Sequence, residues 1–305
     1  MTDLLFHHYD ASPFSEKIRV LFGVKGLAWR SVVQPNMMPK PHLVPLTGGY
    51  RRIPVLQIGA DVYCDSALIA RVLERLHPNP TSHPGGSEGL CNALGFWTDR
   101  ALFLAAVPVV FGKMGAAVPQ AFIEDRRKLM GGNVDFSVVM QNAPLAADQL
   151  RAHAEWIDLQ LGDGRPFLLG ERPSLADASA YHPVWFVRSL PPTKDSFSEF
   201  PRLVAWTERV KALGHGRRSE CAPEEALRIA REARPATAPE KDPRDPNGLE
   251  PGMKLRVLPD DYGFDPVEGE LVASSTQEIA LRRSAPEVGE VIVHFPRAGY
   301  RVLRV

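Results

Sequence analysis

The chain has 305 residues, and its 36 Lys and Arg balance 36 Asp and Glu, so the formal net charge is zero. A nucleic-acid-binding protein normally carries a basic excess, which this composition does not offer. The longest apolar run, residues 101–111, is shorter than the roughly 20 residues that cross a bilayer, so no membrane partner is expected.

Strand and helix patterns alternate in residues 1–78. The runs LLFHHY and WRSVVQ are typical of short strands, and the segment between them has apolar residues at helical spacing. After a loop rich in Pro and Gly, IPVLQIGADVYC predicts two more strands, and DSALIARVLERLH predicts a helix that ends before Pro78. The order β-α-β-loop-β-β-α indicates a small α/β domain.

A turn-rich linker at 79–87 leads into a region where helical patterns dominate. They fall at about 88–112, 119–130, 141–161, 174–189 and 201–213. In the fourth segment Asp177 follows Ser174 by three residues, which resembles a capping box and predicts a helix start with a structural role. We expect an all-α helical domain at 88–232.

A second linker, 233–248, is dense in Pro and charge, and the composition changes beyond it. Residues 249–305 hold five short alternating segments, MKLRVLP, GELVASS, EIALRRS, EVIVHFP and YRVLRV. Strands at this spacing predict a small β-barrel, an SH3-like module or an open sheet. Acidic residues balance its arginines locally, so a solvated surface is favoured over a nucleic-acid site.

The three cysteines, Cys64, Cys91 and Cys221, are far apart and odd in number. This pattern argues against a secreted disulfide framework, and the N-terminus lacks the features of a signal peptide. His, Cys and carboxylate residues do not cluster at the spacing of metal ligands, so we expect no metal. Together these features predict a cytoplasmic protein.

Four segments, SPFSEKIR, RRIPVL, YCDSALIARVLE and PFLLGERPSLADASAY, stand in a fixed order along the chain. Their order and spacing resemble the glutathione S-transferase family over roughly residues 3–215. The resemblance implies a thioredoxin-like α/β domain followed by an α-helical bundle domain, with glutathione as co-substrate, and a homodimer. Ordinary members end after the helical domain, so the β module is an addition whose partner, if any, is unidentified.

By this resemblance, four residues bind glutathione. The Ile53–Pro54 peptide bond would be cis, and the Ile53 backbone would pair with the cysteinyl part of glutathione as an added strand. A trans proline at the start of a strand is the alternative. Ser66 would hold the α-carboxylate of the γ-glutamyl group at a helix N-terminus, and Asp65 the α-ammonium, although the family more often has Glu there. The structural alternative is that either residue only caps the helix.

Ser12 is the predicted catalytic residue. Standing before Pro13, it is well placed to cap the first helix. The resemblance implies that its hydroxyl also donates a hydrogen bond to the glutathione sulfur, with Tyr9 as the rival residue. Serine cannot form a mixed disulfide, so a thiol-disulfide oxidoreductase is less favoured.

The electrophile pocket is less well specified. The resemblance places it at the first helices of both domains, where aromatic residues at helical spacing are also typical of a core. The candidates are Phe14, Trp97, Arg100, Phe103 and Phe111.

We therefore expect a glutathione transferase-like enzyme that activates the glutathione thiolate for attack on a small apolar electrophile. One alternative is a non-catalytic glutathione-binding or scaffold protein that uses the β module for recognition. A glutathione-dependent isomerase or peroxidase is another, with the same residues around the sulfur.

Overall fold

The computed structural model describes residues 3–132 and 135–305. Its strands are β1 (Leu5–His8), β2 (Ala28–Val33), β3 (Val55–Ile58), β4 (Asp61–Cys64), β5 (Arg217–Glu220), β6 (Lys254–Pro259), β7 (Val267–Ser274), β8 (Glu278–Ala285), β9 (Gly289–Pro296) and β10 (Tyr300–Arg304). Its α-helices are α1 (Pro13–Val24), α2 (Val44–Thr47), α3 (Ser66–Leu76), α4 (Glu88–Trp97), α5 (Phe103–Met114), α6 (Gln120–Leu129), α7 (Phe136–Gln141), α8 (Ala143–Gln160), α9 (Leu175–Arg188), α10 (Pro201–Ala212) and α11 (Pro223–Glu232).

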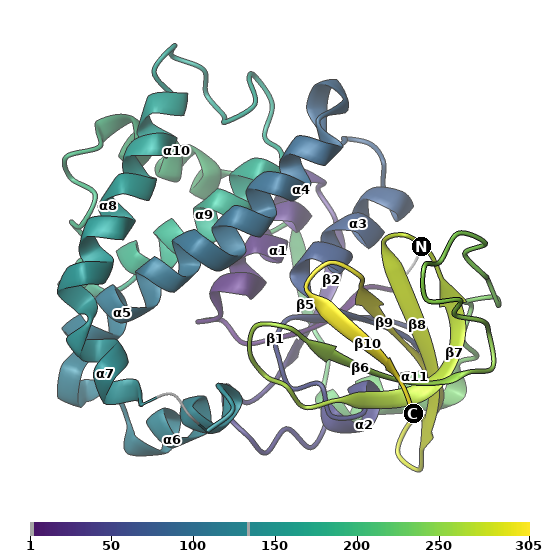
Figure 1. Cartoon of the computed structure of the whole chain (residues 1–305). Coiled ribbons are helices and arrows are strands. Elements are labelled where there is room, and N and C mark those ends of the chain that lie inside the picture. Colours follow the sequence, from purple (N-terminus) through teal and green to yellow (C-terminus); the bar gives the residue numbers. More distant parts are fainter. Residues whose placement is uncertain (1–2, 133–134) are drawn as a thin grey trace.

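The thioredoxin-like region, β1 to α3, has the predicted element order (Figure 1). β1 lies between β2, to which it is parallel, and β3, to which it is antiparallel, and β4 pairs antiparallel with β3. Alternate side chains of β1 enter different cores, because successive side chains of a strand point to opposite faces. Phe6 packs with α1 and α3, whereas Leu5 packs with Cys221 and Ala226. The predicted Pro- and Gly-rich loop contains one short helix, α2.

The helical region, α4 to α10, agrees with the predicted segments and adds the short α7. A π-helical turn (Thr98–Leu102) joins α4 to α5, so that Glu88–Ala117 is continuous, and by length and composition it could cross a membrane. No such segment was expected from the sequence. In the structure this helix contacts α8 and α9 within the bundle, and 39% of its most apolar window is buried. The capping box of Ser174 and Asp177 is present at the start of α9.

Residues 217–232 depart from the expected organisation. The sequence pattern predicted no strand between the first linker and about residue 250, and it placed this segment in the helical domain. Instead, β5 pairs parallel with β2 at the edge of the sheet, and α11 packs against β2 and β9. β5 is exposed and polar over its whole length, RRSE, so it carries no hydrophobic alternation from which it could have been recognised.

The C-terminal module, β6 to β10, continues the thioredoxin-like sheet. Its antiparallel strands have the order β10-β6-β7-β8-β9, and β9 pairs parallel with β4, so one ten-stranded sheet runs from β10 to β5. Figure 1 shows the module strands strongly curved beside the thioredoxin-like region. Among the described residues β9 pairs with β4 and β8, not with β10, so the five strands form a curved open sheet.

Two hydrophobic clusters hold the three regions together. The larger one joins one face of the thioredoxin-like sheet, including Phe6 and Leu56, to α1, α3 and the helical region. The other joins Val55 and Val62, on the opposite face, to module residues such as Leu281 and Val293. The thioredoxin-like region therefore packs between the helical region on one face of its sheet and the C-terminal module on the other.

Candidate functional site

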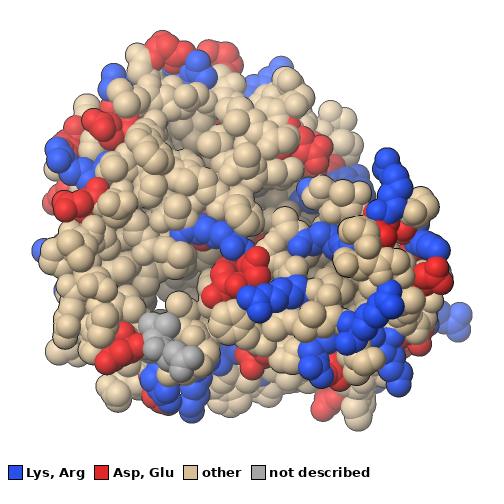
Figure 2. All heavy atoms as spheres, viewed as in Figure 1, with Lys and Arg blue, Asp and Glu red and all other residues tan. Residues whose placement is uncertain are grey.

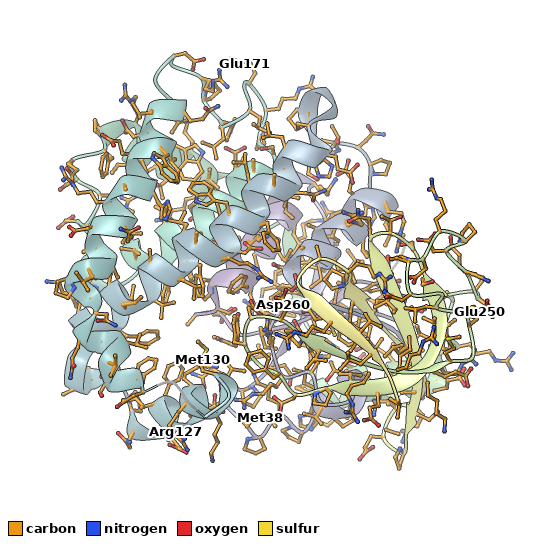
Figure 3. All side chains as sticks on the ribbon, in the orientation of Figure 1. Met38, Arg127, Met130, Glu171, Glu250 and Asp260 are labelled. Atoms are coloured by element: carbon orange, nitrogen blue, oxygen red, sulfur yellow. The ribbon has the colours of Figure 1, made fainter. Side chains whose placement is uncertain are left out.

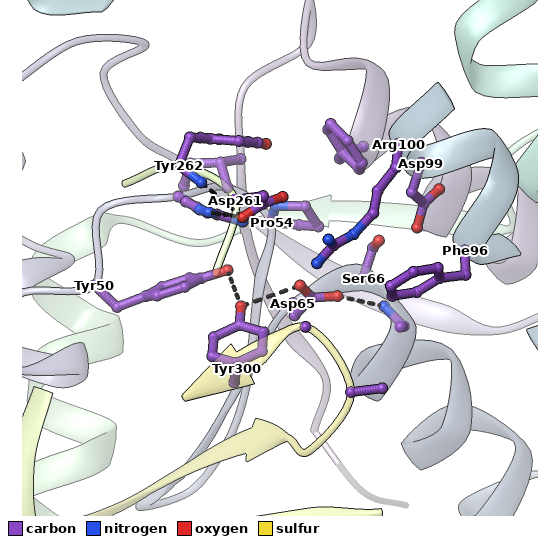
Figure 4. Close-up of a pocket in the computed structure, with 16 residues that line it drawn as sticks. Tyr50, Pro54, Asp65, Ser66, Phe96, Asp99, Arg100, Asp261, Tyr262 and Tyr300 are labelled. Atoms are coloured by element: carbon purple, nitrogen blue, oxygen red, sulfur yellow. Dashed lines mark hydrogen bonds and ion pairs between the residues drawn. The ribbon is translucent and has the colours of Figure 1, made fainter. Parts of the chain in front are cut away.

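A pocket lies where the three regions meet (Figure 4). Its cavity volume is about 70 Å³. The thioredoxin-like region lines it with Phe14, Tyr50, Arg52, Ile53, Pro54, Asp65, Ser66 and Ala67, the helical region with Phe96, Asp99 and Arg100, and the module with Asp261, Tyr262, Ala298, Gly299 and Tyr300.

Asp65 and Ser66 begin α3 at the wall of this pocket. Asp65 is the N-cap, and its Oδ1 accepts a hydrogen bond from the Ala67 backbone N–H at 2.8 Å. Among the described residues it is the one non-glycine with positive φ, 80°. Such a conformation costs on the order of 1–3 kcal/mol and is found preferentially at functional sites. The α3 N-terminus, with Ser66 as its first residue, can attract a carboxylate.

The other carboxylate oxygen of Asp65 is bound by the module. The Tyr300 hydroxyl donates to Asp65 Oδ2 at 3.0 Å and lies 3.1 Å from the Tyr50 hydroxyl, as Figure 4 shows. Burial raises the pKa of Asp65, although the hydrogen bond from Ala67 opposes this. Burial also raises the pKa of both tyrosines well above the usual range, so both hydroxyls keep their protons.

Asp99 presents a charged carboxylate from the helical side of the pocket. Lys17 Nζ donates to its Oδ2 at 2.7 Å, and His182 Nε2 donates to its Oδ1 at 2.9 Å. Burial by itself raises the carboxyl pKa, but the Lys17 charge and the His182 hydrogen bond outweigh it, and the pKa of Asp99 is lowered. This carboxylate is therefore ionised at neutral pH.

Two arginines bind the module at the pocket. Arg52 pairs with Asp261 and stacks on the Tyr262 ring, 3.7 Å from its centroid. Arg100 pairs with Asp260 and lies over Phe96. Figure 2 shows charged groups of both signs gathered at this boundary between the helical region and the module. Each cation thus has a carboxylate from the same module loop.

Ile53 and Pro54 line the pocket together with Asp65 and Ser66, so the four predicted glutathione-binding residues share one site. The Ile53–Pro54 peptide bond is cis, as the resemblance implied, and Pro54 directly precedes β3.

Ser12 is placed differently. As the N-cap of α1, its Oγ accepts a hydrogen bond from the Ser15 N–H at 3.2 Å. It is only 2% exposed, and it does not line the pocket, whereas Phe14 does. Tyr9 is half-buried and also outside the pocket lining. The structural role of Ser12 is confirmed, and its catalytic role stays a prediction.

The electrophile candidates divide into two groups. Phe14 and Arg100 face the pocket. Trp97, Phe103 and Phe111 do not line it: Trp97 packs on His153 and Trp156, Phe103 on Phe14 and His182, and Phe111 on Phe122, Phe136 and Phe186. For these three, the packing alternative fits the structure better.

Several lining residues were missed by sequence reasoning. Arg52 directly precedes the Ile53–Pro54 pair, so its position in the sequence was a usable signal. Tyr50 and Asp99 had weaker signals of the same kind, since Tyr50 lies near the Ile53–Pro54 pair in the sequence and Asp99 is next to Arg100. For Asp261 and Tyr300 no local pattern exists, since only the fold of the module brings them to this pocket.

Comparison with known proteins agrees with this geometry. Residues 6–81 match the family model of the glutathione S-transferase N-terminal domain, and residues 116–209 match that of the C-terminal domain. A GST-like protein from Pseudomonas syringae shares 39% sequence identity with this chain. Its crystal structure superposes on this one with a TM-score of 0.83, and the match covers 100% of both chains. The chain belongs to the glutathione S-transferase family. Because this relative matches over the full length, the module is shared with it.

Other transferase structures match the fold over a smaller share of this chain. A glutathione S-transferase from Rhodospirillum rubrum is 20% identical with a TM-score of 0.53, covering 68% of this chain and 88% of its own. One from Methylobacterium radiotolerans, in complex with glutathione sulfonate, is 19% identical with a TM-score of 0.51, covering 72% and 97%. No protein among curated sequences matches the chain.

Proposed function

We propose that the chain binds glutathione in the pocket at the α3 N-terminus and activates its thiolate for attack on a small apolar electrophile. The observation that carries this is the meeting of Ile53, Pro54, Asp65 and Ser66 in one pocket of a glutathione S-transferase fold. A member of the same fold, from Methylobacterium radiotolerans, forms a complex with glutathione sulfonate.

The γ-glutamyl group supplies two charges that match this wall. Its α-carboxylate would accept hydrogen bonds from the Ser66 hydroxyl and the backbone N–H groups that begin α3. Its α-ammonium would lie against Asp65, with the ionised Asp99 as a second acidic neighbour of the pocket. The Ile53 backbone would pair with the cysteinyl part as a short added strand.

The thiolate then needs a stabilising donor. A free thiol with a pKa of about 8.5 is only about 3% ionised at neutral pH, and lowering its pKa by about two units is worth about 2.7 kcal/mol. One hydrogen bond to a charged group supplies roughly 1.5–3 kcal/mol, and a helix N-terminus up to about 1 kcal/mol more. Ser12 Oγ accepts from Ser15 N–H, which leaves its own proton to donate to the sulfur.

The test is an ultraviolet titration of the thiol of bound glutathione. We expect a bound thiol pKa about two units below the free value in the wild type, and near the free value in Ser12→Ala. Ser12→Thr, which keeps both hydroxyl and cap, should restore the low value. Tyr9→Phe tests the rival donor. An unshifted thiol in the wild type would reject thiolate activation, and an unchanged value in Ser12→Ala would reject Ser12.

A non-catalytic glutathione-binding protein is the second candidate. The burial of Ser12, at 2% exposure, and its place outside the pocket lining favour it. In that case glutathione binds with its thiol pKa unshifted, and conjugation of electrophiles is the same with wild type and Ser12→Ala. Calorimetric binding combined with the thiol titration separates the two functions.

A further inference from the structure

The pocket is too small for the ligand that its walls suit. Its cavity volume of about 70 Å³ is well below the roughly 300–1,000 Å³ of pockets that hold small molecules. A tripeptide therefore enters only if part of the wall moves. The part of the wall that moves belongs to one of the three regions that line the pocket.

Two of the module's contributions lie outside its strands. The loop at 260–266 joins β6 to β7, and the turn at 297–299 joins β9 to β10. The Asp260 N–H donates to the Gly299 carbonyl at 3.0 Å, which ties loop and turn together. We call these two segments, 260–266 and 297–299, the lid. Figure 3 shows Asp260 at the edge of the module that faces the helical region.

Polar contacts hold the lid against the other regions. Asp260 pairs with Arg100 of the helical region, and Asp261 with Arg52 of the thioredoxin-like region. The Gly263 N–H also donates to the Leu129 carbonyl at 2.7 Å. By contrast, the strands behind the lid are fixed by the β9–β4 pairing and by a hydrophobic cluster. Neither the β9–β4 pairing nor this cluster includes a lid residue.

Gly299 permits this close approach. A Cβ atom there would lie 2.9 Å from Arg100 Nη2, and the residue has φ of 86°, which favours glycine. The guanidinium therefore passes directly against the turn. The two carboxylates that bind the arginines are partly exposed, 36% for Asp260 and 27% for Asp261, so salt can weaken both pairs.

We propose that the lid covers the glutathione site, that the Arg52–Asp261 and Arg100–Asp260 pairs hold it shut, and that ligand enters when they part. The identity of the ligand rests on the proposed function, but the opening of the lid does not. The module is then a moving wall of the site, in addition to any role as a separate recognition domain.

Opening can be measured without a ligand. Ser66→Cys places a thiol in the pocket wall at a position that is 3% exposed, where a small thiol reagent reports access. Combining it with Asp260→Asn and Asp261→Asn should accelerate labelling about tenfold, which corresponds to about 1.4 kcal/mol for the two pairs together. Asn keeps the side-chain oxygen that accepts from the Tyr262 N–H.

Glu268→Gln is the matched control, because it breaks the exposed Arg256–Glu268 pair between β6 and β7, outside the lid. Labelling of the protein with Ser66 intact gives the background from Cys64, Cys91 and Cys221, which are buried. A second measurement uses Ser66→Cys without lid substitutions: raising the salt from 0.1 to 1 M should accelerate labelling several-fold. Equal rates in the lid variant and its parent, or labelling insensitive to salt, would overturn the lid.

Glutathione binding then separates this inference from the proposed function. With Ser66 retained, stopped-flow association of glutathione should be about tenfold faster in the Asp260→Asn, Asp261→Asn variant than in Glu268→Gln. Faster labelling with no glutathione binding by any variant would reject the proposed function and leave the lid. Normal glutathione binding with unchanged labelling would reject the lid and leave the function.

Discussion

Two buried histidines lie where the thioredoxin-like region joins its neighbours, and their environments differ. His182, of the helical region, shares the Asp99 carboxylate with Lys17. His294, of the module, lies between two carboxylates: its Nδ1 is 2.7 Å from Glu278 Oε1, and its Nε2 is 3.3 Å from Asp61 Oδ1. The first network therefore has a buried cation of its own, Lys17, whereas the second has, besides the imidazole, the mostly exposed Arg75, 3.4 Å from Glu278.

This difference decides the direction in which the pKa of each ring is shifted. Burial lowers the pKa of His182, and the hydrogen bond and charge of Asp99 do not overcome it. Burial acts the same way on His294, but the bonds and charges of Asp61 and Glu278 outweigh it and raise its pKa. Among the described residues, His182 Nδ1 has no partner, whereas both nitrogens of His294 face acceptors.

The comparison teaches that the pKa of a buried histidine rises where the carboxylates around it lack a buried cation of their own. In the joint to the helical region, Lys17 pairs with the Asp99 carboxylate at 2.7 Å. The joint to the module depends on a bound proton. The module should therefore be the part of the molecule whose attachment responds most to alkaline pH.

The largest expected effect comes from Lys17→Met, which removes the cation from the first network. Because Asp99 is left as a partly buried carboxylate without its main partner, the free energy of unfolding should fall by about 3 kcal/mol. The pKa of His182 should rise as it takes over the role of Lys17, and NMR titration of the ring measures this. Lys17→Met with Asp99→Asn should recover part of the stability. An unchanged His182 pKa would show that Lys17 does not account for the difference between the two histidines.

His294→Gln should have the next largest effect, because it leaves the buried Asp61 and the partly buried Glu278 with no positive charge except that of the exposed Arg75. We expect a loss of about 2–3 kcal/mol in denaturant unfolding at pH 6. Adding Glu278→Gln should restore part of that loss, since only one buried carboxylate then remains. A double variant no more stable than the single one would show that charge is not the cause.

The pH dependence of stability tests the contribution of the His294 proton directly. The folded pKa of His294 is raised above the unfolded value of about 6.5, so its contribution to stability is complete below pH 6.5 and is lost as the pH rises through the folded value. The stability difference between wild type and His294→Gln should therefore shrink between pH 6 and pH 9. Groups common to both proteins, including Lys40 with its pKa lowered by burial to about 8, cancel in this difference. A constant difference would mean that His294 is neutral.

Arg75→Ala should have the smallest effect. Arg75 Nη1 lies 3.4 Å from Glu278 Oε2, and its side chain is mostly exposed, so the pair is worth on the order of 0.2–1 kcal/mol. Thermal unfolding in low and high salt measures it. A loss as large as that from His294→Gln would show that Arg75, and not the imidazole, is the main cation of the second network.

Much of the site was predictable where its residues are neighbours of a regular element. Asp65 and Ser66 stand at the start of a strongly amphipathic helix, and Pro54 precedes a strand, so local pattern placed all three at the ends of elements. The family resemblance assigned them to one site, and the structure brings them together. The electrophile candidates were predicted less well, because the spacing that puts Trp97, Phe103 and Phe111 on helix faces does not say which face meets the pocket.

The sequence by itself determined the order of strands and helices, the caps of α1, α3 and α9, and the presence of a separate β-rich segment after residue 249, because these depend on side chains a few positions apart. Only the tertiary structure decided that β9 pairs with the β4 edge, that β5 joins the sheet, and that Tyr300 reaches Asp65 across 235 positions of sequence. Such contacts depend on how whole elements bury their apolar faces, and no local pattern of residues records that choice.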